Sequence, residues 1–128
     1  MDDMKISNSK KNKIDKLIEI SLNDALTNYQ IISKDHKLIY KIKLVSELCI
    51  DALEKGNKLI FAGNGGSAAD AQHICAEFVA RFEKERKSLA AISLATNIST
   101  ITAISNDYSF DDIYSRQISS IGLKGDIF

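Results

Sequence analysis

The 128-residue sequence has no proline, only two cysteines, no net charge and no long apolar run. Its 17 Lys and Arg residues are balanced by 17 Asp and Glu residues, so it lacks the basic excess that binding to a nucleic-acid backbone requires. No apolar stretch approaches the roughly 20 residues of a membrane span, and the first residues are acidic and polar. We therefore expect a cytoplasmic protein whose partners include neither a nucleic acid nor a membrane.

The two cysteines lack the spacing of a redox or metal motif. Cys49 and Cys75 stand far apart, without a C-x-x-C pair, and each falls among apolar residues with a helical pattern. A free cysteine usually behaves as a small buried hydrophobe, so two inert thiols are expected. With 45% hydrophobic and 27% charged residues, the composition is that of one globular domain.

The N-terminal part of the sequence has the pattern of two helices. Residues 1–13, rich in Lys, Asn and Ser, are predicted to form a polar leader. Apolar residues then recur every three or four positions over residues 14–29 and again over 35–55, which predicts a helical hairpin spanning residues 14–55. Its apolar stripe either packs on the rest of the chain or forms an oligomer interface, because the pattern does not say whose surface it covers.

After Gly56 the sequence alternates between strand-like and helix-like segments. Strands are predicted at 58–62, 89–94 and 126–128, and helices at 68–82, 98–104 and 109–122. A solvated, charged connector is expected at 83–87. Ser109 is the expected N-cap of the last helix, since two aspartates follow it in the first turn. This order predicts an α/β fold with a doubly wound parallel sheet.

A glycine-rich turn, Gly63–Ser67, connects the first predicted strand to the helix that follows it. In parallel sheets such turns lie where ligands bind, and the helix N-terminus behind the turn attracts anions. The turn has neither the Gly-Lys-Ser/Thr ending of a Walker A loop nor the spacing of a dinucleotide-binding fingerprint, so a nucleotide is not indicated. It is either a ligand site or only a tight connection.

Polar residues on the helix after this turn share one face. They are spaced three or four positions apart, and they are Asp70, His73, Glu77 and Arg81. One interpretation is a solvated face in which Glu77 pairs with its neighbours. The other is a site for a small polar or anionic ligand, with Glu77 as an acid or base and with His73 and Glu77 as half of a zinc site.

Six short motifs follow one another from about residue 56 to the end of the chain. They are Gly63-Asn-Gly-Gly-Ser-Ala-Ala-Asp-Ala-Gln-His73, Ala76-Glu-Phe78, Arg81-Phe82, Thr102-Ala-Ile-Ser-Asn-Asp-Tyr108, Tyr114-Ser-Arg-Gln117 and Gly122-Leu-Lys-Gly-Asp126. In this order they resemble the phosphoheptose isomerases of the sugar isomerase (SIS) domain superfamily. The resemblance implies an SIS-type doubly wound sheet with helices on both faces. It also implies an aldose–ketose isomerase that converts sedoheptulose 7-phosphate to D-glycero-D-manno-heptose 7-phosphate through an enediol, the first step toward heptose for bacterial surface polysaccharide such as lipopolysaccharide.

The same resemblance implies roles for individual residues. Glu77 corresponds to the family's catalytic glutamate, a base that also binds zinc, and His73 corresponds to a second zinc ligand. The implied substrate-binding residues are Asn64, Gly65, Gly66, Ser67, Glu77, Arg81, Asn106 and Asp107, the last two in a loop before Tyr108. Family members are typically homotetramers with sites between subunits, so a homotetramer that binds a phosphosugar is expected.

The sequence departs from the family pattern at its end. In the family a Ser/Thr-rich phosphate loop follows the strand that begins Gly-Asp-Ile, and a later helix supplies a Gln and a His; neither is present here. We therefore expect residues 56–128 to be the first part of an SIS domain, with half of a zinc site and no activity alone. The alternative is a non-catalytic SIS-domain binding module, such as a relative that binds the replication initiator, although Glu77 favours the enzyme lineage.

Overall fold

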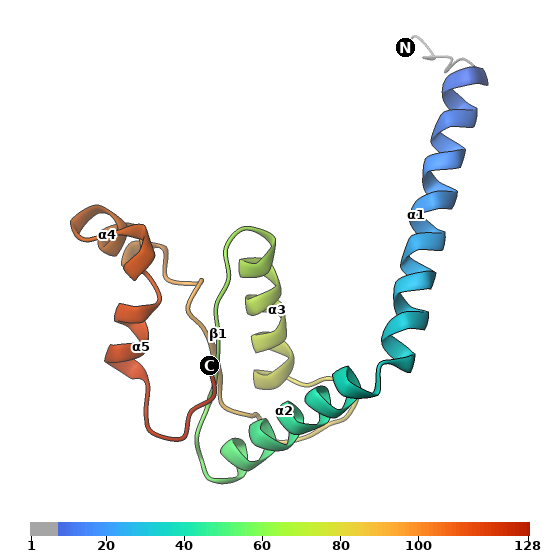
Figure 1. Cartoon of the computed structure of the whole chain (residues 1–128). Coiled ribbons are helices and arrows are strands. Elements are labelled where there is room, and N and C mark those ends of the chain that lie inside the picture. The colour runs from blue at the N-terminus through green and yellow to red at the C-terminus, as the bar shows by residue number, and fades with distance from the viewer. Residues whose placement is uncertain (1–7) are drawn as a thin grey trace. The chain divides into compact units, whose positions relative to one another are not determined.

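The computed structural model describes residues 8–128 (Figure 1). Its elements are, in order, α1 (Asn8–Lys34), α2 (His36–Glu54), β1 (Leu59–Phe61), α3 (Gly66–Val79), β2 (Ala91–Ser93), α4 (Ile98–Asp107), a 3-10 turn (Phe110–Asp112) and α5 (Ser115–Ile121). The chain forms two compact units, residues 1–44 and 45–128, and each is described by itself. Within the described part of the chain, no helix is both long and apolar enough to cross a lipid bilayer.

The first unit holds α1 and the start of α2. The helix α1 begins at Asn8, so the polar leader predicted for residues 1–13 is wrong for residues 8–13, and the rest of that leader lies outside the described residues. Lysines are good helix formers, and extending an existing helix is far easier than nucleating one, so the helix continues through the lysine-rich stretch. Asp35 separates the two helices and caps α2, because its Oδ1 accepts hydrogen bonds from the N–H groups of Lys37 and Leu38, both at 3.0 Å.

The apolar stripe of α1 is exposed along the helix. Leu17 is 55% exposed, Leu22 is 66% exposed and Tyr29 is 73% exposed. The two successive helices are confirmed, and within the first unit this stripe is not covered. Both interpretations given above, packing on the rest of the chain and an oligomer interface, therefore stay predictions.

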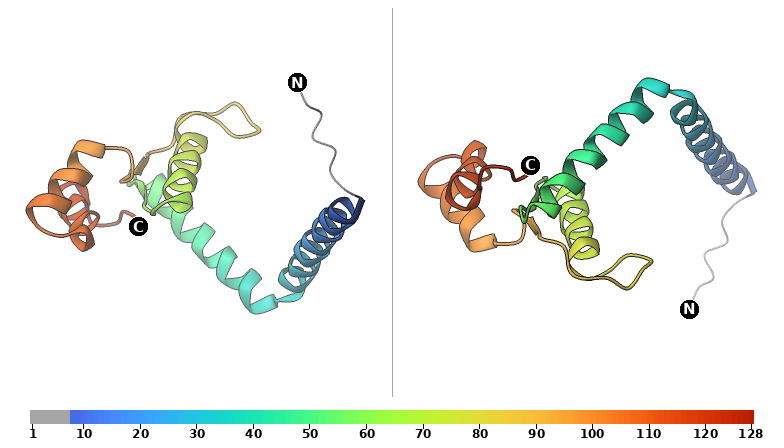
Figure 2. Two further views of the ribbon diagram at one scale, coloured as in Figure 1. Left: turned by 90° about the horizontal axis from the view of Figure 1, so that it is seen from above. Right: turned by 90° about the horizontal axis from the view of Figure 1, so that it is seen from below.

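The second unit is built on a small parallel sheet in which β1 is the central strand. Leu59 pairs with Ala91 of β2, and on its other edge β1 bonds to Ile127, since the Ile60 N–H donates to the Ile127 carbonyl at 2.8 Å. The chain thus crosses from β1 to one neighbour and then returns to the other, which is the doubly wound arrangement predicted. Helix α3 lies on one side of the strands, and α4 and α5 lie on the other (Figure 2).

The strands are shorter than expected, but the buried apolar residues belong to the segments that the sequence predicts as strands and helices. β1 and β2 have three residues each, and the third predicted strand is represented by the bridge at Ile127. The buried apolar side chains are Ala52, Leu59, Ile60, Ala71, Leu94 and Ile113. The rings of Phe61 and Phe78 stack with their centroids 5.9 Å apart, which packs α3 against β1. The opposite face of α3, with its polar residues, is consequently directed away from the sheet.

Asp126 holds the segment that carries Ile127 beside β1. Its carboxylate accepts hydrogen bonds from the Lys58 ammonium at 2.6 Å, from the Lys58 N–H at 3.0 Å and from the Leu123 N–H at 2.8 Å. These donors, the Lys58 side chain first, hold the pKa of Asp126 far below its ordinary value. The acidic residue of the Gly-Asp-Ile motif therefore has a structural role in this chain.

Both cysteines are free and half-buried, as expected of ordinary thiols. Burial raises the pKa of the Cys75 thiol, and a hydrogen bond with the Ser93 backbone only partly offsets that effect. Cys75 consequently stays protonated at neutral pH and is a poor nucleophile.

Candidate functional site

The glycine-rich loop lies at the carboxyl end of the central strand. Because β1 has a neighbour on each edge, the loop after it stands at the point where the chain reverses direction across the sheet, which is where doubly wound folds bind ligands. Gly63 allows a close approach there, since a Cβ at this position would lie 2.5 Å from the Ser67 carbonyl oxygen. Gly65 has a φ of +56°, in the left-handed region that favours glycine.

The loop leaves the N-terminus of α3 open. The N-cap residue Gly65 provides no side-chain hydrogen bond, and the helix begins with the Ala68 N–H bonded to the Gly65 carbonyl at 3.1 Å. The Gly65 and Gly66 N–H groups precede this first turn, and the loop residues 64–67 are exposed. Exposed N–H groups at a helix N-terminus suit an anion or the oxygen of a sugar hydroxyl.

Two residues that the site prediction left out bond to the segments that follow β1 and β2. The Tyr114 hydroxyl lies 2.5 Å from the Gly63 carbonyl oxygen and 3.0 Å from Oδ1 of Asn64. Gln117 donates to the carbonyl of Leu94, just after β2, at 3.1 Å. Both residues belong to the Tyr114-Ser-Arg-Gln117 motif, but the motif alone does not show that it reaches the loops after the strands.

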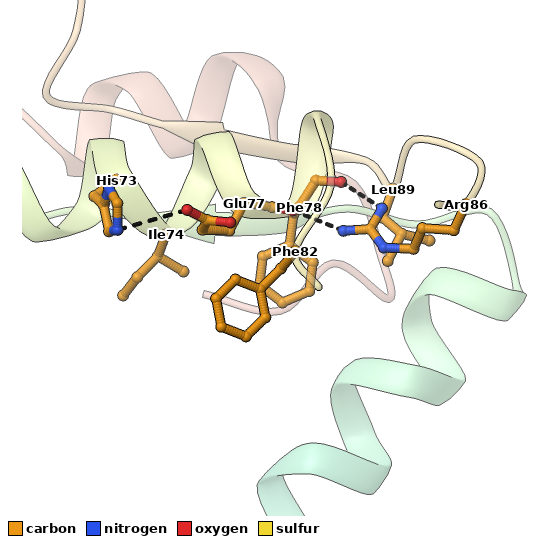
Figure 3. A pocket seen from close by; sticks show the side chains of 7 residues that line it. All are labelled: His73, Ile74, Glu77, Phe78, Phe82, Arg86 and Leu89. Carbon is orange, nitrogen blue, oxygen red and sulfur yellow. Dashed lines mark hydrogen bonds and ion pairs between the residues drawn. The ribbon is translucent and has the colours of Figure 1, made fainter. Parts of the chain in front are cut away.

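His73 and Glu77 lie side by side on the outer face of α3 (Figure 3). The His73 Nε2 and Glu77 Oε1 atoms are 3.6 Å apart, and the side chains are 77% and 34% exposed. They form one edge of a groove of about 500 Å³. The residues that line it are His73, Ile74, Glu77, Phe78, Phe82, Arg86 and Leu89, so an apolar surface adjoins the carboxylate and the imidazole.

The His73–Glu77 pair has a spacing that fits two ligands of one zinc ion. Ligand bonds of about 2.0–2.2 Å at a tetrahedral angle place the two donor atoms about 3.3–3.5 Å apart. The distance of 3.6 Å between Nε2 and Oε1 is close to this value. Within residues 8–128 no third His, Cys, Asp or Glu joins them to form a metal-binding group. The distance is therefore compatible with two ligands of a zinc ion, and zinc binding itself stays a prediction.

Arg81 does not lie on the helical face where the sequence places it. Helix α3 ends at Val79, two residues before Arg81, so the predicted helix through residue 82 is too long. The Arg81 guanidinium pairs with Glu85 at 2.6 Å in the connector, and both side chains are exposed. The prediction of Arg81 as a neighbour of Glu77 on α3 is wrong in this chain.

Arg86 accounts for the early end of the helix. Its Nη2 donates to the Glu77 carbonyl at 2.6 Å and its Nη1 donates to the Phe78 carbonyl at 2.9 Å (Figure 3). A cation that bonds the last carbonyls of a helix satisfies them and favours termination there. The connector at 83–87 is thus not merely solvated, because Arg86 folds back onto the turn that carries Glu77.

The two remaining predicted site residues are in the last turn of a helix. Asn106 and Asp107 were expected in a loop before Tyr108, but α4 continues through Asp107. The Asn106 amide donates to the Asp107 carboxylate at 2.9 Å, and both residues are exposed. The predicted end of the helix at residue 104 fell one turn short, since the Tyr108 N–H still bonds to the Ile104 carbonyl.

The structure therefore gathers the predicted site residues into separate groups. His73 and Glu77 form one group, and the loop of residues 64–67 forms another at the opposite end of α3. At 1.5 Å per residue, Gly66 and Glu77 lie about 16 Å apart along the helix axis. Within one chain, the glycine-rich loop and the carboxylate do not adjoin each other.

Comparison with known proteins identifies the fold. The SIS domain family matches residues 24–128, which is most of the chain. The chain belongs to the SIS domain family. The match begins within α1, earlier than residue 56, where the sequence predicts that the SIS domain begins, so this SIS domain includes helical residues before the sheet.

The relatives of this SIS domain are phosphoheptose isomerases. Phosphoheptose isomerase 2 of Campylobacter jejuni is 49% identical over 105 residues, which are 82% of this chain and 52% of that protein. Phosphoheptose isomerase of Clostridium acetobutylicum is 44% identical over 110 residues, which are 86% of this chain and 56% of that protein. The chain spans about half the length of the curated relatives it matches.

Solved structures give the same result for the SIS fold. Phosphoheptose isomerase of Neisseria gonorrhoeae matches with a TM-score of 0.80 and 34% identity, over 88% of this chain and 57% of that chain. A phosphoheptose isomerase from Francisella tularensis matches with a TM-score of 0.74 and 31% identity, over 91% of this chain and 58% of that chain. The predicted α/β fold class and the family resemblance are both confirmed.

Proposed function

We propose that this SIS domain acts on a phosphosugar, as an aldose–ketose isomerase that converts sedoheptulose 7-phosphate to D-glycero-D-manno-heptose 7-phosphate. The observation that carries the proposal is the Glu77 carboxylate, which is about one-third exposed and stands 3.6 Å from His73 beside a groove. Its setting is an SIS domain 49% identical to a phosphoheptose isomerase. A carboxylate that is accessible but held by a neighbour is suited to transfer a proton.

The reaction requires one base that serves two carbons. Glu77 would remove a proton from C1 of the open-chain ketose, and the electron pair would form the C1–C2 double bond of an enediolate. The same carboxyl group would then return the proton to C2, while the proton of the C1 hydroxyl passes to the C2 oxygen, so that C1 becomes the aldehyde carbon. Substrate, enediolate and product differ only in the positions of protons and electron pairs, so no oxidant or reductant is consumed.

His73 and Glu77 would also hold a zinc ion, completed by ligands from outside the described residues. When bound, zinc would supply Lewis-acid polarisation of the sugar carbonyl. The N–H groups of Gly65 and Gly66 and the side chains of Asn64 and Ser67 would bind the polyol or phosphate portion of the sugar. Arg81, Asn106 and Asp107 are retained as substrate-binding residues only by resemblance.

The separation within α3 supports a site built from more than one copy of the chain. The glycine-rich loop and Glu77 lie about 16 Å apart along one helix. The apolar stripe of α1 is exposed, with Leu22 66% exposed, and could bring copies together. We therefore propose that the chain forms a homotetramer. We also propose that this assembly is cytoplasmic and that its product supplies heptose for lipopolysaccharide or a similar surface polysaccharide.

A chimera tests whether Glu77 is the base. Because this chain spans about half of its relatives, it would be continued by the second half of the Campylobacter jejuni relative. Glu77→Gln is expected to lower kcat on the order of 10²- to 10⁴-fold, the usual contribution of a general base. Glu54→Gln makes the same change at an exposed position of α2 and should leave kcat nearly unchanged. Conversion would be measured by a coupled assay of the heptose phosphate formed.

Two results would count against the assignment. Undiminished turnover by the Glu77→Gln chimera, with its circular dichroism spectrum intact, would show that another group is the base. A chimera that folds and oligomerises but converts no sedoheptulose 7-phosphate would favour the alternative, a non-catalytic SIS-domain binding module.

Zinc binding by the chain itself tests the half-site. His73→Ala is expected to weaken the affinity for Zn²⁺ by at least about tenfold, because it removes one of two ligands. Asp70→Ala, on the same helix, is the matched control and should have little effect. Competition with a coloured zinc chelator would give both affinities, and equal values for the His73→Ala and unmodified chains would remove His73 from the site.

A further inference from the structure

The residue that links the glycine-rich loop to α5 is Tyr114, just before α5 begins at Ser115. Its side chain is half-buried, and its hydroxyl oxygen lies 2.5 Å from the Gly63 carbonyl oxygen and 3.0 Å from Oδ1 of Asn64. Gly63 and Asn64 lie in the glycine-rich loop, two and three residues after the central strand β1 ends at Phe61. Tyr114 thus contacts the loop from a residue 50 positions away in the sequence.

The number of protons on a phenol limits how these two contacts can be made. A tyrosine hydroxyl donates one hydrogen bond and accepts others, whereas a carbonyl oxygen only accepts. The closer partner, the Gly63 carbonyl at 2.5 Å, must receive the proton, since two acceptor oxygens at that distance would repel each other. The Tyr114 oxygen then has only lone pairs to offer Asn64. Two oxygens would then face each other, so the favourable arrangement turns the Asn64 amide by about 180° and presents its NH₂ group, which has nearly the same shape as the oxygen, to Tyr114.

We propose that Tyr114 is a positioning residue that fixes the polarity of the ligand loop, with the Asn64 NH₂ group bonded to Tyr114 and the Asn64 carbonyl oxygen facing the ligand. The inference rests on the proposed function, which it deepens by naming the chemical group that the loop recognises. An outward carbonyl oxygen accepts a hydrogen bond from a sugar hydroxyl and repels a phosphate oxygen. Asn64 therefore selects the polyol part of a phosphosugar, while the Gly65 and Gly66 N–H groups donate to hydroxyl oxygens beside it.

Nuclear magnetic resonance of the side-chain amide tests the polarity without any ligand. In the unmodified chain, one NH₂ proton of Asn64 should exchange with water more slowly than those of exposed asparagines, and Tyr114→Phe should abolish that protection. Tyr108→Phe is the matched control, because Tyr108 is 60% exposed and its ring, which lies 3.7 Å from the Arg116 guanidinium carbon, is retained in phenylalanine. If both Asn64 amide protons exchange as fast as exposed ones in the unmodified chain, or if Tyr114→Phe leaves them unchanged, the proposal is overturned.

Titration with sedoheptulose 7-phosphate, followed on the backbone amide signals of residues 63–67, tests the consequence for binding. Tyr114→Phe should weaken binding about 3- to 10-fold, the usual effect of losing one hydrogen bond, and Tyr108→Phe should not. Equal affinity in the Tyr114→Phe and unmodified chains would overturn the role of Tyr114 in recognition. If the unmodified chain shows slow Asn64 exchange but no response to the sugar phosphate, the proposed substrate fails while the arrangement of Tyr114 stands. The two failures are therefore distinguishable.

Discussion

At the scale of single residues, the polar contacts of the Asp126 side chain stabilise the second unit. Its side chain is 5% exposed and its partner Lys58 is 22% exposed. Bonds from Lys58 and Leu123 depress the pKa of Asp126 in the folded state. A depressed pKa means that the folded state prefers the ionised form more strongly than the unfolded state does. The resulting stability is complete above the unfolded pKa of about 3.9 and is lost as the pH falls through and below it.

Asp126→Asn is therefore expected to lower stability at neutral pH and to reduce its dependence on acid. The urea midpoint should fall at pH 7, and the difference between the variant and the unmodified chain should shrink between about pH 5 and pH 2. Asp51→Asn is the matched control, because Asp51 pairs with Lys55 at 3.9 Å with both side chains well exposed. An Asp126→Asn variant that loses stability with acid in parallel with the unmodified chain would refute this role.

The residue scale also shows which site predictions could be made from sequence. The pairing of His73 with Glu77 was predictable, because residues four apart on a helix are neighbours. The neighbourhood of Arg81 was not, because it depended on whether the helix continued for one more turn. The contact of Tyr114 with the glycine-rich loop could not be predicted from the sequence for a different reason, because it joins residues 50 positions apart.

At the scale of elements, the C-terminus of α3 depends on a residue outside the helix. Arg86 donates to the carbonyls of Glu77 and Phe78 with a two-pronged guanidinium, an arrangement that a lysine ammonium cannot reproduce in full. This contact fixes the turn that carries the proposed base. The charged connector therefore supports the groove on which the proposed function depends.

Arg86→Ala is expected to lower the free energy of unfolding by about 1–3 kcal/mol, the usual range for hydrogen bonds to a charged group. Arg86→Lys should recover only part of this loss. Arg81→Ala is the control, since the exposed Arg81–Glu85 pair should contribute no more than about 1 kcal/mol. Urea unfolding followed by circular dichroism measures all three, and an Arg86→Ala chain as stable as the Arg81→Ala chain would contradict the capping role.

The elements themselves were largely predictable because their signals are local. Ser109 is an N-cap as predicted, since its hydroxyl accepts from the Asp111 N–H at 3.1 Å, but it caps the 3-10 turn and not the last helix, α5. The helix predicted over residues 109–122 is instead a short 3-10 turn followed by α5. Apolar periodicity does not distinguish one continuous helix from two short ones that keep the same face toward the sheet.

At the scale of the whole molecule, the apolar stripe of α1 is exposed within its own unit. Leu22 and Leu26 are 66% and 57% exposed, and they lie one turn apart on the same face. An apolar stripe of this length on a helix is usually covered by a partner. A second copy of the chain is the partner that the proposed homotetramer supplies.

Changing the stripe should therefore change the oligomeric state. Leu22→Glu combined with Leu26→Glu is expected to shift the sedimentation coefficient toward that of a single chain, because charges in an apolar interface oppose association. Asn23→Glu with Thr27→Glu adds the same charges to a different face of α1 and should leave the oligomer intact. Sedimentation velocity distinguishes the outcomes, and an unmodified chain that sediments as a monomer at all concentrations would refute the proposed assembly.

The sequence by itself determined the features that depend on near neighbours along the chain. These are the alternation of strands and helices, the cap at Ser109 and the pairing of His73 with Glu77, since each rests on contacts within about one helical turn. The tertiary structure alone decided where α3 ends, how Tyr114 holds the glycine-rich loop and how Asp126 joins Lys58. Those contacts connect residues from eight to 68 positions apart, and only folding brings such partners within hydrogen-bonding distance.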